Sequence, residues 1–216
     1  MKVLVACEES QAVTKEFRKL GHEAYSCDLK DCSGGHPEWH IKGDALDNLK
    51  GYDFMGAHPV CKYLTNSGVG WLARKKPTLG FDWSERYQIY MNWDRYQKMI
   101  EGAEFFNKML AAVKETGKGY VENPIMHKYA KEIITEPYTQ IIQPYEYGHP
   151  ESKATCLWVV GLPKLEPSDN VKHVWQSLPK KEAQRLHYLP PSTNRDELRS
   201  KTYTGIAKAI AEQWSE

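Results

Sequence analysis

Cys61 is the residue whose type and setting best suit a nucleophile. It stands in the turn His58-Pro59-Val60-Cys61, directly after a weak apolar run at 52–57 that is typical of a strand. The thiolate is the reactive form of cysteine, and a strand-terminal turn provides the exposure and polar setting that a reactive thiolate needs. Because a lone cysteine is more often a small buried apolar residue, a structural role stays open beside the chemical one.

Glu122 offers a carboxylate that could handle a proton for such a nucleophile. The run 119–121 predicts a short strand, and Glu122-Asn123-Pro124 follows it. The proline restricts the backbone of Asn123 and so fixes the turn after the strand. A carboxylate positioned in this way can act in general acid–base catalysis. Cys61 and Glu122 together therefore indicate nucleophilic catalysis.

Two aspartates at the ends of earlier strands suit a cofactor that carries a nucleoside. Asp28 follows a strand expected at 22–27, and its carboxylate could accept two hydrogen bonds from a ribose diol. Asp44 holds the next strand-to-loop position and could accept from an adenine amine. Both residues could equally be helix caps or turn formers. The sequence has neither a G-x-G-x-x-G nor a Walker A motif.

Short apolar runs alternate with helical patterns along the chain and predict the elements that position these residues. Strands are expected at 3–6, 22–27, 52–57, 119–121, 139–143 and 155–160, and helices at 11–20, 83–114 and 204–214. This alternation predicts an α/β fold with a mostly parallel sheet and helices on both faces. Ligands bind beyond the carboxyl ends of such strands. One edge should therefore gather Glu8 and Ser10, Asp28, His58-Pro59-x-Cys61 and Glu122-Asn123-Pro124.

The motifs around Cys61 and Glu122 resemble those of DNA cytosine-C5 methyltransferases. AHPVC at 57–61 looks like the Pro-Cys nucleophile motif of that family, and VENP at 121–124 is similar to its Glu-Asn motif. The order of the two motifs and their separation of about sixty residues also fit. The segment 143–158 resembles a strand block of short, phage-type members. The resemblance covers most of 1–160 and the tail at 202–205.

The resemblance implies an activity, a fold and a cofactor. The chain would be a single domain over 1–216 with a Rossmann-like S-adenosylmethionine-dependent methyltransferase fold. Cys61 would attack C6 of cytosine, C5 would take the methyl group, and Glu122 would contact N3 and the exocyclic amine. DNA would be the partner, with the target base out of the stack. A phage or prophage origin and a bacterial cytoplasmic location are also implied.

The resemblance assigns further residues to the cofactor and to the substrate. Those expected at the cofactor are Cys7, Glu8, Ser10, Asp28, Asp44, His58 and Pro59. Those expected at the substrate are Asn123, Pro124, His149, Lys153, Arg74 and Lys75. His149 and Lys153 belong to the run GHPESK and could equally be solvated loop residues. The chain lacks the Gln-x-Arg-x-Arg block of the family, for which Lys153 could supply one cation, and its first loop is Glu8-Glu9-Ser10 instead of an aromatic residue with a glycine-rich turn.

The chain is short for a full target-recognition domain, and the segment 63–95 is the nearest substitute. It interleaves Arg74, Lys75, Lys76, Arg86 and Arg95 with Trp71, Trp83, Tyr87, Tyr90 and Trp93. Such a mixture suits phosphate contact combined with base stacking. A solvated helix with an aromatic core face accounts for it equally well. The polar, proline-containing segment 163–199 is expected to be irregular.

The composition restricts which binding partners and which cellular compartment are expected. The 29 Lys and Arg residues nearly balance the 28 Asp and Glu residues, so DNA contacts would have to come from local basic patches. No apolar run reaches the roughly 18 residues of a transmembrane helix, and the start MKVLVACEES looks like a buried strand without the features of a signal peptide. Five irregularly spaced cysteines suggest reduced thiols in a cytoplasm.

Several alternatives remain beside this interpretation. Cys27, Cys32, His36 and His40 form a C-x4-C-x3-H-x3-H run that zinc would accept, although the favoured expectation is a site without metal. The acceptor could be RNA or a free pyrimidine nucleotide on the same fold. A cofactor-binding or nucleic-acid-binding protein without turnover is the non-catalytic alternative.

Overall fold

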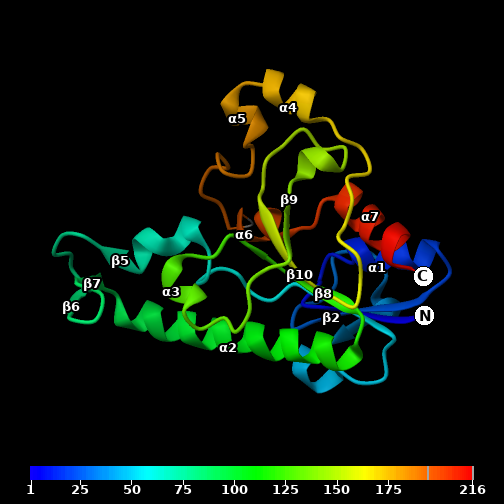
Figure 1. The fold of residues 1–216 in the computed structure, drawn as a ribbon, viewed down its shortest axis with the longest axis horizontal. Helices are drawn as coiled ribbons and strands as arrows, with labels where there is room; N and C mark the ends of the chain where they lie inside the picture. Colours follow the sequence, from blue (N-terminus) through cyan, green and yellow to red (C-terminus); the bar gives the residue numbers. More distant parts are fainter. Residues whose placement is uncertain (194, 216) are drawn as a thin grey trace.

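A seven-stranded mixed sheet forms the centre of the computed structural model, which describes residues 1–193 and 195–215 (Figure 1). Its strands are β1 (Lys2–Ala6), β2 (Glu23–Asp28), β3 (His40–Lys42), β4 (Phe54–Ala57), β8 (Gly119–Pro124), β9 (Gln140–Ile142) and β10 (Thr155–Val160). They lie in the order β3-β2-β1-β4-β8-β10-β9. The first five in this order are parallel to one another, whereas β10 is antiparallel to both β8 and β9.

Helices cover both faces of the sheet because successive strand residues point to opposite sides. In β1, Val3 and Val5 pack with α1 (Ala12–Lys19) and α7 (Thr204–Trp214), whereas Leu4 and Ala6 pack with α2 (Trp93–Thr116). In Figure 1, α2 runs along one side of the sheet while α1 and α7 lie together on the other. The expected Rossmann-like α/β fold, with a mostly parallel sheet and helices on both faces, is confirmed.

The helix expected at 83–114 begins later than the sequence suggested. Residues 82–91 form β6 (Asp82–Ser84) and β7 (Ile89–Met91), which join β5 (Ala73–Arg74) in a three-stranded antiparallel sheet. Trp83 and Tyr90 face each other across this pair, with ring centroids 5.2 Å apart, and such aromatic pairs favour strands. Asn92 then caps α2 by accepting from the backbone N–H of Arg95 at 2.9 Å.

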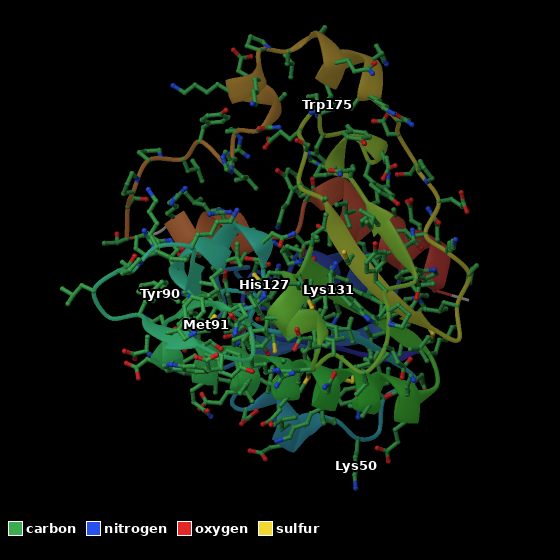
Figure 2. The ribbon with its side chains drawn as sticks, turned by 60° about the vertical axis from the view of Figure 1, so that its left-hand side comes forward. Lys50, Tyr90, Met91, His127, Lys131 and Trp175 are labelled. Atoms are coloured by element: carbon green, nitrogen blue, oxygen red, sulfur yellow. The ribbon has the colours of Figure 1, made fainter. Side chains whose placement is uncertain are left out.

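Two parts of the chain project from the large sheet. The small sheet, with Tyr90 and Met91, lies at one end of the molecule, and the helix that carries Trp175 lies far from it (Figures 1 and 2). The segment expected to be irregular at 163–199 contains three short helices, α4 (Lys172–Ser177), α5 (Lys180–Ala183) and α6 (Arg195–Ser200). The remaining short elements are α3 (Lys128–Lys131) and the 3-10 turns Pro37–Trp39, Ala45–Asn48, Asn66–Trp71 and Pro144–Glu146.

The topology brings the carboxyl ends of five strands to one edge of the sheet. β3, β2, β1, β4 and β8 are consecutive neighbours and all run in the same direction. The residues expected to meet at this edge therefore do follow adjacent strands. None of the helices within the described residues is both long and apolar enough to span a membrane.

Candidate active site

Backbone contacts anchor the loop that carries Cys61. The N–H of His58 donates to the carbonyl of Ala6 at 2.9 Å, so the chain still lies beside β1 where β4 ends. The carbonyl of Cys61 accepts from the N–H of Leu64 at 3.0 Å, which closes the turn after it. From β8, the Asn123 side chain donates to the carbonyl of Pro59 at 3.4 Å. The half-buried Cys61 is thus held between the ends of β4 and β8.

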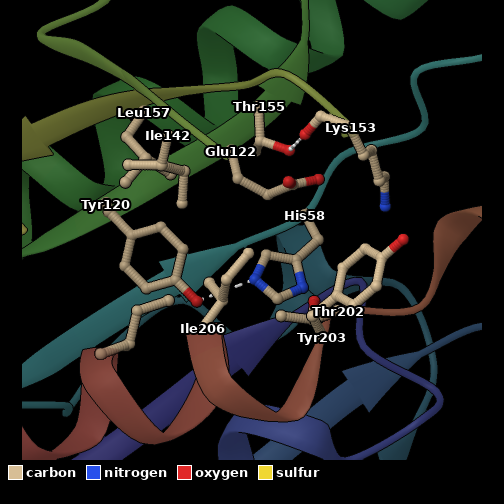
Figure 3. A pocket seen from close by; sticks show the side chains of 11 residues that line it. His58, Tyr120, Glu122, Ile142, Lys153, Thr155, Leu157, Thr202, Tyr203 and Ile206 are labelled. Atoms are coloured by element: carbon tan, nitrogen blue, oxygen red, sulfur yellow. Dashed lines mark hydrogen bonds between the residues drawn. The ribbon is translucent and has the colours of Figure 1, made fainter. Parts of the chain in front are cut away.

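Glu122 lies in a pocket between the sheet and α7 (Figure 3). Residues two apart on a strand share a face, so Glu122 points to the same side as Tyr120, toward α7. Its carboxylate lies close to the side chains of Lys153 and His58 in Figure 3. The pocket is lined by His58, Tyr120, Glu122, Ile142, Lys153, Thr155, Leu157, Thr202, Tyr203, Ile206 and Ile210. Polar groups thus meet a largely apolar wall.

The ionisation of Cys61 and that of Glu122 are linked. Burial raises the pKa of the Cys61 thiol, and the charge of Glu122 raises it further, whereas Lys153 and Arg199 lower it. Burial also raises the pKa of Glu122, with Lys153 opposing. Glu122 is therefore biased toward the protonated form, in which it can donate a hydrogen bond. A protonated Glu122 also removes the negative charge that disfavours the Cys61 thiolate.

His58 is a neutral wall of this pocket. Burial, with the nearby charge of Lys153, lowers the pKa of His58 to about 3. Its Nε2 lies 2.8 Å from the Tyr120 hydroxyl, a contact that Figure 3 shows as a dashed line. Gly56 makes room for the buried Tyr120 ring, since a Cβ there would lie 2.9 Å from the ring. His58, which was expected at the cofactor, lines the same pocket as Glu122. Pro59, also expected there, is buried, and its carbonyl accepts the hydrogen bond from Asn123.

Cys7, Asp28 and Asp44 lie close together at the ends of β1, β2 and β3. Burial raises the pKa of Cys7 to about 12, and the charges of Asp28 and Asp44 add to this rise. Asp28 accepts from the N–H of Lys30 through Oδ1 at 2.9 Å, and Asp44 accepts from the N–H of Leu46 through Oδ1, also at 2.9 Å. Each aspartate is thus a turn former or cap as well as a cofactor candidate, and within the described part of the chain its Oδ2 makes no hydrogen bond.

Glu8 has a structural role instead of the expected cofactor contact. Its buried carboxylate accepts from the N–H of Val13 and from the hydroxyl of Thr14, each at 2.7 Å, and from the N–H of Thr14 at 3.2 Å. These bonds satisfy free N–H groups of the first turn of α1. The neighbouring Ser10 is half-buried in the loop that joins β1 to α1.

The C-x4-C-x3-H-x3-H run does not come together as a zinc site. His40 directs Nδ1 at the hydroxyl of Ser26, 2.8 Å away, and Nε2 at the carbonyl of Lys30, 2.9 Å away. His36 pairs with Glu38 at 3.0 Å. Among residues 1–193 and 195–215, no group of three or more His, Cys, Asp or Glu residues could hold a metal ion.

The residues expected at the substrate have different positions. Lys153 lies in the pocket with Glu122, and Pro124 pairs with Thr155 at the end of β8. His149 instead accepts from the N–H of Gly205 at 3.0 Å through Nε2, so it anchors the start of α7. Arg74 and Lys75 are exposed at and just beyond β5 in the small sheet.

Of the residues that line this pocket, only His58, Glu122 and Lys153 were expected from the sequence, and Tyr120, Thr155 and Tyr203 are notable among the others. The position of Tyr120 could have been predicted from the sequence pattern, because it is two residues before Glu122 on a strand and so shares its face. Tyr203 and Thr155 lacked such a signal, since they reach the pocket from α7 and β10 only through the packing of distant segments. Tyr203 is further held by a hydrogen bond from its hydroxyl to Glu151 at 2.9 Å.

Comparison with known proteins finds matches among solved structures. No protein-family model matches the sequence, and no curated protein matches it. Among solved structures, the Entamoeba histolytica methyltransferase EhMeth is 12% identical with a TM-score of 0.46, over 78% of this chain and 57% of that protein. The S. pombe Dnmt2 methyltransferase is 12% identical with a TM-score of 0.36, over 88% and 59%. The chain thus spans less than two thirds of either protein. Its mostly parallel sheet with flanking helices is a Rossmann-like α/β arrangement.

Proposed function

We propose that this chain transfers a methyl group from S-adenosylmethionine to C5 of cytosine in DNA, with Cys61 as the nucleophile. The observation that carries this proposal is the pairing of Cys61 with Glu122 at the ends of the neighbouring parallel strands β4 and β8. The contact from Asn123 to Pro59 supports it by joining the two motifs. A thiol beside a carboxyl group that favours its protonated form suits addition to an electron-poor ring.

The residues at the ends of β1, β2 and β3 fit a nucleoside-bearing cofactor. Asp28 keeps one carboxylate oxygen for a ribose hydroxyl, and Asp44 keeps one for an amine. Both lie beside Cys7 at the same sheet edge as Cys61. S-adenosylmethionine, when bound, supplies an electrophilic methyl group, while the chain supplies position and electrostatics.

The residues of the chain handle the bonds and protons of the cytosine ring. Cys61 forms a bond from Sγ to C6, and the electron pair of the C5–C6 double bond becomes available at C5. Glu122 in its protonated form donates to N3, so that the ring accepts the added electron density. Once C5 has taken the methyl group, with S-adenosylhomocysteine as the other product, the proton on C5 would leave to water. Its electron pair would re-form the C5–C6 double bond as the bond from Sγ to C6 breaks. Cys61 is then free again as a thiolate.

The small sheet is the proposed contact for nucleic acid. Trp71, 65% exposed, stacks with the guanidinium of Arg74, and Lys75 and Lys76 follow on the same exposed stretch. Exposed aromatic rings beside lysine and arginine fit base stacking combined with phosphate contact. This supports DNA as the acceptor, even though the net charge of the whole chain is only +1.

The test is incubation with methyl-labelled S-adenosylmethionine and, separately, DNA, RNA and free pyrimidine nucleotides, followed by mass spectrometry of the nucleosides. We expect labelled 5-methylcytosine from DNA. The Cys61→Ala variant should yield no label while it binds the cofactor as the wild type does. Label in RNA or in a free nucleotide would mean that this molecule, and not DNA, is the methyl acceptor. No label with any acceptor, from folded protein that binds the cofactor, would contradict the proposed activity.

A further inference from the structure

Lys153 is a half-buried cation beside Glu122 without a carboxylate partner in ion-pair range. Its Nζ donates to the carbonyl of Lys201 at 3.4 Å and lies 6.0 Å from the centre of the Tyr203 ring. Within residues 1–193 and 195–215, Lys153 takes part in no ion pair. Burying a cation without a counterion costs free energy, so this position favours the arrival of an anion.

The short helix α6 brings a second cation to the same place. Asp196 pairs with Lys62, the residue after Cys61, at 3.3 Å. Residues three apart on a helix share a face, so Arg199 lies on the side of α6 that faces the Cys61 loop. Beyond the other end of the helix, Lys201 receives the bond from Lys153. α6 thus reaches from the Cys61 loop to the pocket.

Arg199 has no anionic partner of its own among the described residues. Glu197 on the same helix already pairs with Lys201 at 3.0 Å, and Asp196 pairs with Lys62. Arg199 is half-buried, and its charge lowers the pKa of the Cys61 thiol, which fits its position on the side of α6 that faces the Cys61 loop. Two cations from segments far apart in sequence therefore flank Cys61.

We propose that Arg199 and Lys153 form a binding site for the phosphate of the target cytosine nucleotide, next to Cys61. This rests on the proposed function, because the site is defined relative to the nucleophile. A guanidinium recognises phosphate through paired hydrogen bonds, and an ammonium contributes a point charge. The phosphate is either a diester within DNA or the monoester of a free nucleotide. In both cases it holds the sugar and base against Cys61 and Glu122.

Binding without the methyl donor tests this proposal separately from catalysis. Fluorescence anisotropy with a labelled, cytosine-containing DNA duplex over a range of salt concentrations measures affinity and its salt dependence. Calorimetry with deoxycytidine monophosphate and with deoxycytidine isolates the phosphate. The variants are Arg199→Ala and Arg199→Lys. Lys208→Ala is the matched control, because Lys208 lies on α7 beside Glu212, 3.7 Å away, and also carries one positive charge. Thermal unfolding checks that each variant is folded.

We expect Arg199→Ala to weaken the phosphate-bearing probe about tenfold and, for duplex DNA, to lower the salt slope by about one. Arg199→Lys should keep most of the salt slope, and Lys208→Ala should match the wild type. Loss with the duplex identifies a diester, and loss with deoxycytidine monophosphate but not deoxycytidine identifies a monoester.

Some outcomes would overturn the phosphate site. These are unchanged affinity for both probes in Arg199→Ala, a loss of affinity in Arg199→Lys equal to that of the alanine variant, and a wild type that binds neither probe. If phosphate-dependent binding is present but no acceptor is methylated, the proposed activity fails while the phosphate site stands.

Discussion

Cys61 and Glu122 need opposite protonation states for the proposed reaction, and the site links the two. Burial raises the pKa of both groups, and Lys153 lowers both. The active form has Cys61 ionised and Glu122 protonated. Because the thiol is ordinarily the weaker acid, this form is a minority of the enzyme, and its fraction is largest between the two pKa values.

The pH dependence of methyl transfer should therefore be bell-shaped and should shift when Lys153 is replaced. Lys153→Met removes the charge that lowers both pKa values, so both limbs of kcat/KM against pH should move to higher pH. Steady-state rates from acidic to alkaline pH measure this. Lys208→Met serves as the control and should leave the profile in place. Unmoved limbs in Lys153→Met would show that Lys153 does not act on these groups.

Asp28 belongs to the proposed cofactor side of the site. Asp28→Ala should weaken S-adenosylmethionine binding by about tenfold to a hundredfold, because hydrogen bonds to a charged group contribute roughly 1.5–3 kcal/mol. Calorimetric titration measures the dissociation constant. Asp53→Ala is a matched control. Asp53 lies just before β4 and accepts from the backbone N–H of Lys2, at the edge of the sheet opposite to the carboxyl ends of the parallel strands. An unchanged dissociation constant in Asp28→Ala would remove Asp28 from the cofactor site.

At the scale of elements, Glu8 couples the start of α1 to the sheet. Burial raises its pKa to about 7 from an ordinary value of 4.5, against hydrogen bonds that lower it. Between these two pH values the folded protein holds a proton that the unfolded chain releases. The contribution of Glu8 to the free energy of unfolding is therefore full below pH 4.5 and is lost as pH rises toward 7.

Replacing Glu8 should flatten this dependence. Glu8→Gln removes the titrating group, so its free energy of unfolding should fall less between pH 4.5 and 7 than that of the wild type. Urea unfolding at several pH values measures the slope. Glu104→Gln, at an exposed position of α2, should keep the wild-type slope. Equal slopes for Glu8→Gln and the wild type would mean that Glu8 titrates alike in the folded and unfolded states.

At the scale of the whole molecule, the small sheet extends the protein beyond the large sheet. The exposed Trp71 lies in the 3-10 turn before β5, and the exposed lysines 75 and 76 follow β5, whereas Lys19 of α1 and Lys208 of α7 pair with acidic neighbours. Positive charge without acidic partners beside exposed aromatic rings favours contact with a phosphate backbone. If DNA is the acceptor, this end of the molecule should contribute to affinity more than the helices on the opposite side.

The double variant Lys75→Ala/Lys76→Ala should weaken duplex binding and lower its salt slope by about two, while S-adenosylmethionine affinity stays unchanged. Anisotropy titrations at several salt concentrations measure both quantities. Lys19→Ala/Lys208→Ala removes the same charge from α1 and α7 and should bind DNA as the wild type does. Equal losses of DNA affinity in the two double variants would mean that net charge, and not the small sheet, determines DNA binding.

The sequence by itself determined the fold class and the residues that lie at the carboxyl edge. Strands and helices follow from local periodicity, so the strand at 155–160 and the helix at 204–214 agree with the observed β10 and α7. Periodicity failed at 83–92, where aromatic pairing across β6 and β7 produces strands in a stretch that also fits a helix. Pairing between strands is a tertiary contact that no local pattern reports.

Only the tertiary structure decided what each polar side chain does. The carboxylate of Glu8 accepts hydrogen bonds from residues of α1 that are five and six positions away in sequence. The ring of His149 accepts one from Gly205, 56 residues away. His58 meets Tyr120 across a separation of 62 residues. The physical reason is that a buried polar group must find a partner wherever the fold provides one. The roles of His149 and His58 therefore depend on distant segments, whereas Glu8 finds its partners on the helix that follows it. The element that carries each residue depends mainly on its neighbours in sequence.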